Sequence, residues 1–275
     1  MTIKLIALDL DGTLLNSQKE ISEANQAALK AARSKGVKVV LTTGRPLPAV
    51  IPYLEKLDLL HAEDYSLTFN GGLIQQNDGT ILDKIGFNYE DVQRIRKVTD
   101  ELSLPLDVVQ GGDVYVLHSK TESLYASCNP LLHYIPTDFD DLDKGQEFNK
   151  AVSSADPSLL DRALNEIPEE LFEQYEIFKS RDLILEWSPK GVHKANGLKK
   201  LIAHLGIQQE EVMTCGDEDN DFSMIEWAGL GVCMANGSEK VKAVAKVVTP
   251  MTNDQDAVAW AVKKYVLEEE SDGTL

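Results

Sequence analysis

Short apolar runs alternate with helical patterns at both ends of the chain. β-branched and aliphatic residues predict buried strands over residues 3–8, 37–41 and 65–69. Helices are predicted between them, one capped by Ser22 and ending at Gly36, the other over residues 46–57. Strands that are apolar on both faces and separated by helices are typical of a parallel sheet covered by helices.

The same alternation returns after residue 190. Helices are predicted over residues 194–204, 219–227, 239–245 and 255–267, and strands over residues 212–215, 230–234 and 246–249. Gly206 is expected to end the first of these helices, and residues 268–275 are expected to be frayed. Residues 1–82 and 190–275 are therefore predicted to form one α/β core.

The middle of the chain has a different pattern. Turn residues at 78–79 and 111–113 predict hairpins over residues 75–82 and 108–117. Helices are predicted over 89–102 and 157–165, the second capped by Asp156, and adjacent strands over 175–179 and 183–187. Hairpins mixed with helices predict an α+β domain, residues 83–189, inserted into the core.

Composition narrows the class of function. A formal net charge of −18 repels nucleic acid and anionic membranes, so neither is expected as a partner. Apolar residues make up 43% of the chain, yet no run reaches the roughly 20 residues that span a bilayer, and no signal peptide is apparent. Three dispersed cysteines fit reduced thiols. We expect a soluble cytoplasmic protein, in which any anionic substrate needs a local positive site.

Two aspartates stand directly after the first predicted strand, in the run DLDGT at residues 9–13. Ligands bind at the carboxyl ends of strands in open α/β sheets. Asp9 and Asp11 would repel each other there, so a compensating cation is expected, and Mg²⁺ prefers such oxygen ligands. A surface Asp-x-Asp-Gly turn is the alternative for this motif alone.

Three further strand ends or helix starts carry polar groups. Thr43 and Gly44 precede a predicted helix, where a hydroxyl and free amides can bind an anion or simply cap the helix. Lys194 begins another helix, and a bound anion would favour it, although most lysines are solvated. Residues 217–221 contain four acids, more than capping requires, which indicates a metal site.

Together these motifs resemble those of haloacid dehalogenase (HAD) superfamily phosphatases. The matching runs, in order, are DLDGT (9–13), TTGRP (42–46), Lys194 and GDEDND (216–221). The long insert resembles the type-2 cap of the Cof-type subfamily, and nearly the whole chain resembles the YidA group of sugar phosphatases, including Asn70-Gly71 and residues 261–267. One departure is His193-Lys194-Ala195, where the subfamily often has Asn-Lys-Gly. The resemblance implies a HAD-like Rossmannoid core with an inserted α+β cap.

The resemblance also implies a division of roles. Asp9 is the expected nucleophile, which forms an aspartyl-phosphate, and Asp11 is the general acid and base. The expected Mg²⁺ ligands are Asp9, the Asp11 carbonyl and Asp217. The phosphate ligands are expected to be Thr43, Gly44, Lys194 and Asn220, with Asp221 orienting Lys194 or a metal-bound water. The expected substrate is a small phosphorylated metabolite, a sugar phosphate in particular.

A charge count refines this expectation. Four aspartates and a phosphate dianion outweigh Mg²⁺ and Lys194, which favours a protonated Asp11 when it acts as an acid. Arg45 could help to balance the charge, or it could equally face solvent.

Some of these residues are also compatible with other chemistries. A phosphomutase could use the same aspartyl-phosphate, and a phospho-regulated binding protein could carry similar acids and a lysine. Cys215 lacks the Cys-x5-Arg phosphate loop of thiolate phosphatases and is expected to be a buried apolar residue. The five histidines have no metal-ligand spacing.

Overall fold

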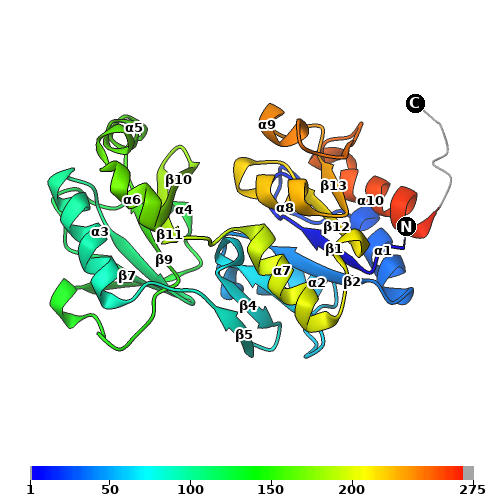
Figure 1. Cartoon of the computed structure of the whole chain (residues 1–275), viewed down its shortest axis with the longest axis horizontal. Helices are drawn as coiled ribbons and strands as arrows, with labels where there is room; N and C mark the ends of the chain where they lie inside the picture. The colour runs from blue at the N-terminus through cyan, green and yellow to red at the C-terminus, as the bar shows by residue number, and fades with distance from the viewer. Residues whose placement is uncertain (1, 269–275) are drawn as a thin grey trace. The chain divides into compact units, whose positions relative to one another are not determined.

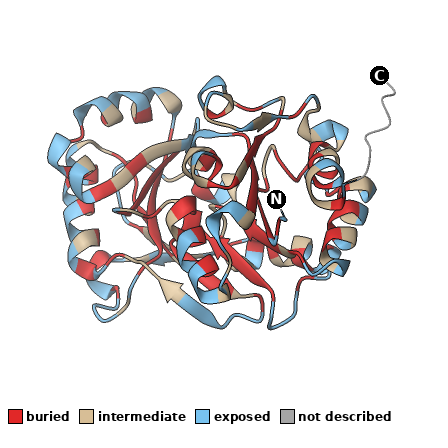
Figure 2. Cartoon of the chain, turned by 45° about the vertical axis from the view of Figure 1, so that its right-hand side comes forward, coloured by how far each residue is buried: buried red, intermediate tan, exposed pale blue. Residues whose placement is uncertain are grey.

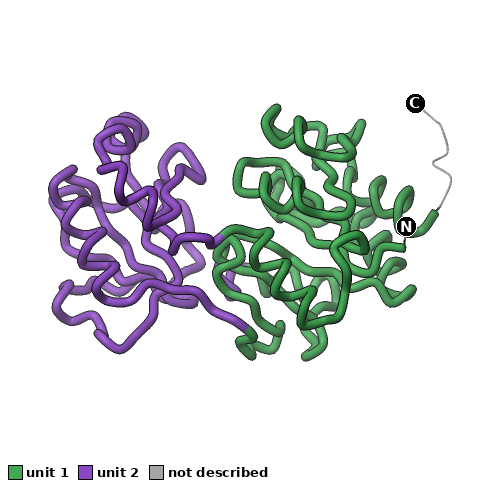
Figure 3. Tube along the Cα trace, in the orientation of Figure 1, with its two compact units in different colours: residues 1–45, 50–82, 193–275 green, residues 46–49, 83–192 purple. Residues whose placement is uncertain are grey.

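In the computed structural model, which describes residues 2–268, the chain divides into two compact units (Figure 3). The first comprises the described residues of Met1–Arg45, Val50–Leu82 and His193–Leu275, and the second comprises Pro46–Ala49 and Asp83–Val192. The sequence predicted that the inserted domain begins at residue 83 and ends at residue 189. In the structure the corresponding segment of the second unit begins at the same residue, Asp83, but ends at Val192. The fraying expected for residues 268–275 falls, apart from Glu268, outside the described residues.

Within residues 2–268, the first unit contains an eight-stranded sheet in the order β14-β13-β12-β1-β2-β3-β4-β5 (Figure 1). The strands are β1 (Leu5–Leu8), β2 (Lys38–Thr42), β3 (Tyr65–Thr68), β4 (Leu73–Gln76), β5 (Ile81–Lys84), β12 (Val212–Gly216), β13 (Leu230–Cys233) and β14 (Val247–Val248). From β14 to β3, each strand pairs with its neighbour in parallel, as predicted from runs that are apolar on both faces of the strand. β3 and β4 pair in antiparallel. The predicted hairpin at 75–82 therefore extends one edge of the core sheet.

Helices flank this sheet. They are α1 (Glu23–Ser34), α2 (Ile51–Lys56), α7 (Lys194–Leu205), α8 (Phe222–Trp227), α9 (Glu239–Lys242) and α10 (Ala257–Val262). The Ser22 side chain accepts a hydrogen bond from the Asn25 amide, and Gly36 and Gly206 have φ of +84° and +68°, so the predicted start and stop signals are confirmed. Leu5 and Ala7 pack on the α7 and α8 side, while Ile6 and Leu8 alternate to the other face.

Three predicted helices are interrupted. Short 3-10 turns at Leu47–Ala49, Asp219–Asp221 and Asn253–Gln255 precede α2, α8 and α10, and Lys263–Leu267 is a π-helical turn. Pro48 and Pro52 lack an N–H donor, which explains why a continuous helix over 46–57 does not form. Asp256, with φ of +61°, separates the last 3-10 turn from α10. Local propensity therefore located these segments but missed their breaks.

The described part of the second unit has a six-stranded sheet in the order β10-β11-β9-β6-β7-β8. The strands are β6 (Asp107–Gln110), β7 (Asp113–Leu117), β8 (His133–Thr137), β9 (Lys150–Ser154), β10 (Tyr175–Arg181) and β11 (Ile184–Pro189); the helices are α3 (Tyr89–Glu101), α4 (Tyr125–Cys128), α5 (Pro157–Glu166) and α6 (Glu169–Gln174). Val108, Ala151 and Trp187 lie side by side on the face that packs on the helices. This mixed sheet with helices confirms the α+β interpretation.

The sequence pattern did not predict β8, β9, α4 and α6. β9 is an interior strand whose five residues are all buried, but it contains Lys150, Ser153 and Ser154, which interrupt an apolar pattern. In both units the buried residues concentrate in the strands (Figure 2). No helix in the described part of the chain is long and apolar enough to cross a membrane.

Candidate active site

Three neighbouring strands of the core sheet deliver the predicted site residues. Asp9 follows β1, Thr43 follows β2, and Asp217 follows β12, with β1 between the other two. The Asp9 amide donates to the Cys215 carbonyl at 3.0 Å, so the parallel ladder continues to the edge of the site. Because parallel strands end at the same edge, residues more than 200 positions apart meet there.

Lys194, the first residue of α7, is fully buried between two carboxylates. Its Nζ donates to Asp9 Oδ1 at 2.5 Å and to Asp221 Oδ1 at 2.6 Å. Asp221 Oδ2 accepts hydrogen bonds from the amides of Asp217 and Glu218 at 2.9 and 3.2 Å. Both Asp221 oxygens are therefore engaged, which suits a residue that orients the lysine, and the alternative of a solvated Lys194 is wrong.

Asp9, Asp217 and Asp221 form a buried acidic cluster, with one carboxylate oxygen of each lying within 4.8 Å of the others. Burial raises the pKa of Asp9 and repulsion from Asp221 raises it further, against the lowering effect of Lys194. Burial and repulsion from Asp9 likewise raise the pKa of Asp217. Three carboxylates face one lysine, so negative charge is in excess, and a divalent cation bound to the carboxylate oxygens would stabilise the cluster.

Gly12 leaves the space that Asp217 occupies. A Cβ on Gly12 would lie 2.1 Å from Asp217 Oδ2, and the φ of Gly12 is +81°, a region that favours glycine. The Thr13 hydroxyl donates to Asp217 Oδ1 at 2.6 Å and so holds the carboxylate in place. The DLDGT run thus shapes the cluster with its glycine and threonine as well as with Asp9.

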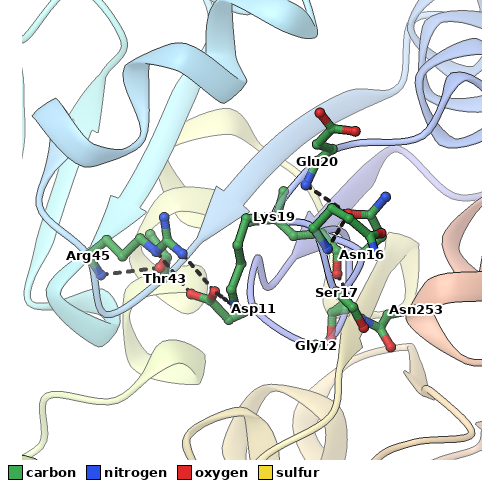
Figure 4. A network of polar contacts seen from close by, with 12 residues as sticks. Asp11, Gly12, Asn16, Ser17, Lys19, Glu20, Thr43, Arg45 and Asn253 are labelled. Carbon is green, nitrogen blue, oxygen red and sulfur yellow. Dashed lines mark hydrogen bonds and ion pairs between the residues drawn. The ribbon is translucent and has the colours of Figure 1, made fainter. Parts of the chain in front are cut away.

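Asp11 does not join this cluster through its carboxylate. Arg45 donates to it from Nε at 2.9 Å and from Nη2 at 2.6 Å, and Lys19 Nζ donates at 2.7 Å (Figure 4). Burial opposes the ionised form, but the hydrogen bonds and charges of Arg45 and then Lys19 outweigh it and lower the pKa of Asp11 to about 2. The protonated Asp11 expected from the charge count is therefore not favoured in this arrangement, and Arg45 does not face solvent.

The predicted phosphate ligands lie beside the cluster. Thr43 is buried and its Oγ1 accepts a hydrogen bond from the Arg45 amide at 3.2 Å. A Cβ on Gly44 would lie 3.1 Å from Asn70 Oδ1, and Asn220 Nδ2 donates to the same oxygen at 3.4 Å. Asn70, which was not among the predicted site residues, therefore lies between two predicted phosphate ligands.

Two residues next to the motifs have structural roles. His193 Nδ1 caps α7 by accepting from the Asn196 amide at 3.4 Å. Cys215 is fully buried, and burial raises the pKa of its thiol to about 12, so it is unsuited to act as a thiolate nucleophile. Lys19 is a site residue that sequence reasoning missed, because its side chain reaches Asp11 only through the fold of the 12–19 loop.

Comparison with known proteins identifies the family of the chain. The sequence model of a family described as haloacid dehalogenase-like hydrolase matches residues 6–262. The chain belongs to this family. The phosphatase YcsE of Bacillus subtilis (strain 168), named for 5-amino-6-(5-phospho-D-ribitylamino)uracil, is 34% identical over 267 residues and is matched over 96% of each chain.

Solved structures give the same result. A haloacid dehalogenase-like hydrolase from Bacteroides thetaiotaomicron has a TM-score of 0.84 and 32% identity, over 96% of this chain and 99% of that one. The HAD subclass IIB sugar phosphatase BT4131 has a TM-score of 0.79 and 25% identity, over 95% and 98%. The predicted HAD-like fold is confirmed, and phosphatase is the class of enzyme that these similarities support.

Proposed function

We propose that this chain hydrolyses small phosphate monoesters, sugar phosphates in particular, through an aspartyl-phosphate on Asp9. The observation that carries the proposal is the placement of Asp9, with one oxygen held 2.5 Å from buried Lys194 beside an acidic cluster. The names of two similar proteins describe a sugar phosphatase and a phosphatase for a phosphoribityl compound, which supports phosphate esters of polyhydroxylated carbon chains as substrates.

Mg²⁺ is the proposed metal. The carboxylates of Asp9 and Asp217 and the Asp11 main-chain carbonyl would hold it, and the raised pKa values of Asp9 and Asp217 support the need for a cation there. When bound, the ion supplies positive charge that offsets the charge of the carboxylates and of the phosphoryl group.

The proposed reaction has two transfers. In the first, an Asp9 carboxylate oxygen bonds to phosphorus as the ester P–O bond breaks, and the departing oxygen takes a proton from Asp11. In the second, a water oxygen bonds to phosphorus as the Asp9–phosphorus bond breaks, and the water proton goes to Asp11. Inorganic phosphate leaves and both aspartates return to their starting states.

The ion pairs of Asp11 bear on both steps. With its pKa lowered to about 2, Asp11 is in the ionised form that accepts a proton from water. Donation to the leaving group requires a protonated Asp11, so its contacts with Arg45 and Lys19 must loosen in that step. Thr43, Gly44, Lys194 and Asn220 are the proposed donors to the phosphoryl oxygens.

The test is Asp9→Asn, which keeps the shape of the side chain but removes the nucleophile. Phosphate release from a panel of phosphorylated metabolites with Mg²⁺ should fall by about 10⁴-fold or more. Asp58→Asn is the matched control, since the Asp58 side chain is exposed and should leave turnover unchanged. Substantial Mg²⁺-dependent turnover by Asp9→Asn would defeat the covalent mechanism.

Two alternatives are separated by the same assays. A phosphomutase would transfer the phosphoryl group to another hydroxyl without releasing inorganic phosphate. A phospho-regulated binding protein would keep its phosphoryl group for minutes, whereas the proposed enzyme would turn over rapidly.

A further inference from the structure

The backbone adopts an unusual conformation directly after β3. Phe69, Asn70 and Gly71 have consecutive positive φ values of 52°, 56° and 89°. A large aromatic residue in this region is an outlier, and such conformations persist only where the surroundings over-determine them. All three residues are buried, so solvent exposure does not explain the turn.

Hydrogen bonds and close packing fix this turn on two sides. The Asn70 amide donates to the Thr43 carbonyl at 2.9 Å, and the Phe69 amide donates to the Arg45 carbonyl at 3.4 Å. On the other side, a Cβ on Gly71 would lie 2.8 Å from the His193 carbonyl oxygen. The turn is therefore packed between the 43–45 segment and the start of α7, which carries Lys194.

The Asn70 side chain projects between two predicted phosphate ligands. A Cβ on Gly44 would lie 3.1 and 3.2 Å from Asn70 Oδ1 and Nδ2, so the carboxamide packs directly on the Gly44 peptide. Asn220 Nδ2 donates one hydrogen to Asn70 Oδ1. Asn70 thus contacts segments that follow two different strands, one at Gly44 and one at Asn220, which is 150 residues away from Asn70 in the sequence.

We propose that Asn70 is a positioning residue for the phosphoryl group, a role that rests on the proposed function. By accepting one hydrogen of the Asn220 amide, Asn70 sets the orientation of that group and leaves its second hydrogen for a phosphoryl oxygen. By packing on Gly44, it also holds the peptide that follows Thr43. Asparagine suits both demands, because it tolerates positive φ and supplies a neutral acceptor.

Two substitutions separate this role from a structural one. Asn70→Gly accepts the positive φ but removes the acceptor, whereas Asn70→Asp keeps an acceptor and adds negative charge beside the phosphate ligands. Asp58→Gly is the matched control, since Asp58 also has positive φ (57°) but an exposed side chain. For each variant we would measure kcat and KM for p-nitrophenyl phosphate with Mg²⁺, inhibition by inorganic phosphate, and thermal unfolding.

We expect Asn70→Gly to lower kcat/KM by about 10- to 100-fold, the effect of misplacing a reacting group, with thermal unfolding close to that of the wild type. Asn70→Asp should lose at least as much activity and should bind inorganic phosphate more weakly. Asp58→Gly should match the wild type in all three measurements.

Wild-type kcat/KM in Asn70→Gly, or losses in both variants that merely follow unfolding, would overturn the positioning role. If the wild type shows no Asp9-dependent hydrolysis, the proposed function fails instead. Calorimetric binding of inorganic phosphate with Mg²⁺ then decides the role of Asn70: weaker binding by Asn70→Asp supports it, and unchanged binding refutes it.

Discussion

Lys194 offers a quantitative test of the site's electrostatics that does not depend on turnover. Lys194→Met removes the ammonium but keeps an unbranched side chain in the same buried space. The change leaves Asp9 and Asp221, at 2.5 and 2.6 Å from Nζ in the wild type, without their shared cation. Removing one partner of a buried ion pair lowers the free energy of unfolding by about 3–5 kcal/mol. Because Lys194→Met leaves two buried carboxylates without a cation, we expect its loss of stability to be near ~5 kcal/mol.

The loss of stability in Lys194→Met should increase with pH. Lys194 lowers the pKa of Asp9, so its removal raises that pKa further above the unfolded value. The folded variant then binds more protons than the unfolded chain, and its stability falls as the pH rises. We therefore expect a larger loss at pH 8 than at pH 5.5, measured by urea unfolding without added metal.

Two controls make this test decisive. Adding Asp221→Asn to Lys194→Met removes one stranded charge and should recover part of the stability. Lys240→Met breaks an exposed pair with Asp219 and should cost no more than about 1 kcal/mol. Equal stability of Lys194→Met and the wild type at pH 8, or a loss that does not change with pH, would refute this account of the cluster.

The remaining predictions concern neighbouring features. Gly12→Ala should lower the free energy of unfolding by about 1–3 kcal/mol or more, because the new Cβ would lie 2.1 Å from Asp217 Oδ2 on a backbone with positive φ. Gly36 also has positive φ, but a Cβ there would meet nothing within 4 Å. An equal loss of stability in Gly36→Ala would therefore contradict a role for the clash. Mg²⁺ should raise the unfolding temperature, and the rise should be larger at pH 8 than at pH 5.5 because binding displaces protons from the aspartates. If Mg²⁺ raised the unfolding temperature of Asp217→Asn as much as that of the wild type, Asp217 would be excluded as a ligand. Burial raises the pKa of Asp107 from 3.8 to about 6, so the folded chain keeps a proton that the unfolded chain releases, and this contribution to stability is lost as the pH rises through 6. At 1.36 kcal/mol per pH unit this is about 3 kcal/mol, and urea unfolding of Asp107→Asn at pH 4 and pH 8 should show a fall in stability between the two pH values that is smaller than the wild type's by about this amount.

Much of the core could be predicted because its signals are local. The apolar runs predicted every strand of the parallel part of the first sheet, and Ser22, Gly36 and Gly206 act as helix boundaries where expected. β9 was missed for a physical reason. A strand buried on both faces need not be apolar when its polar groups are paired, as Lys150 is with Glu186 at 3.0 Å, and that pairing depends on a residue 36 positions away.

The candidate site divides in the same way. Asp9 and Asp217 follow strands and Lys194 begins a helix, and the resemblance of these motifs to those of the family predicted that the three residues would share one site. It could not predict the partners of Asp11. The two arrangements considered for Arg45 differ only in where a long side chain points, and Lys19 contributes from a loop.

The sequence by itself determined the α/β class, the order of the motifs and the set of acids and cations at the strand ends, because periodicity and short motifs encode these locally. The tertiary structure decided which charges pair, that Lys194 rather than Arg45 lies against Asp9, that Asp11 is held ionised, and that Asn70 lies between Gly44 and Asn220. These outcomes depend on distances between segments far apart in the chain. Coulombic and hydrogen-bond energies change steeply with those distances, which only the folded chain sets.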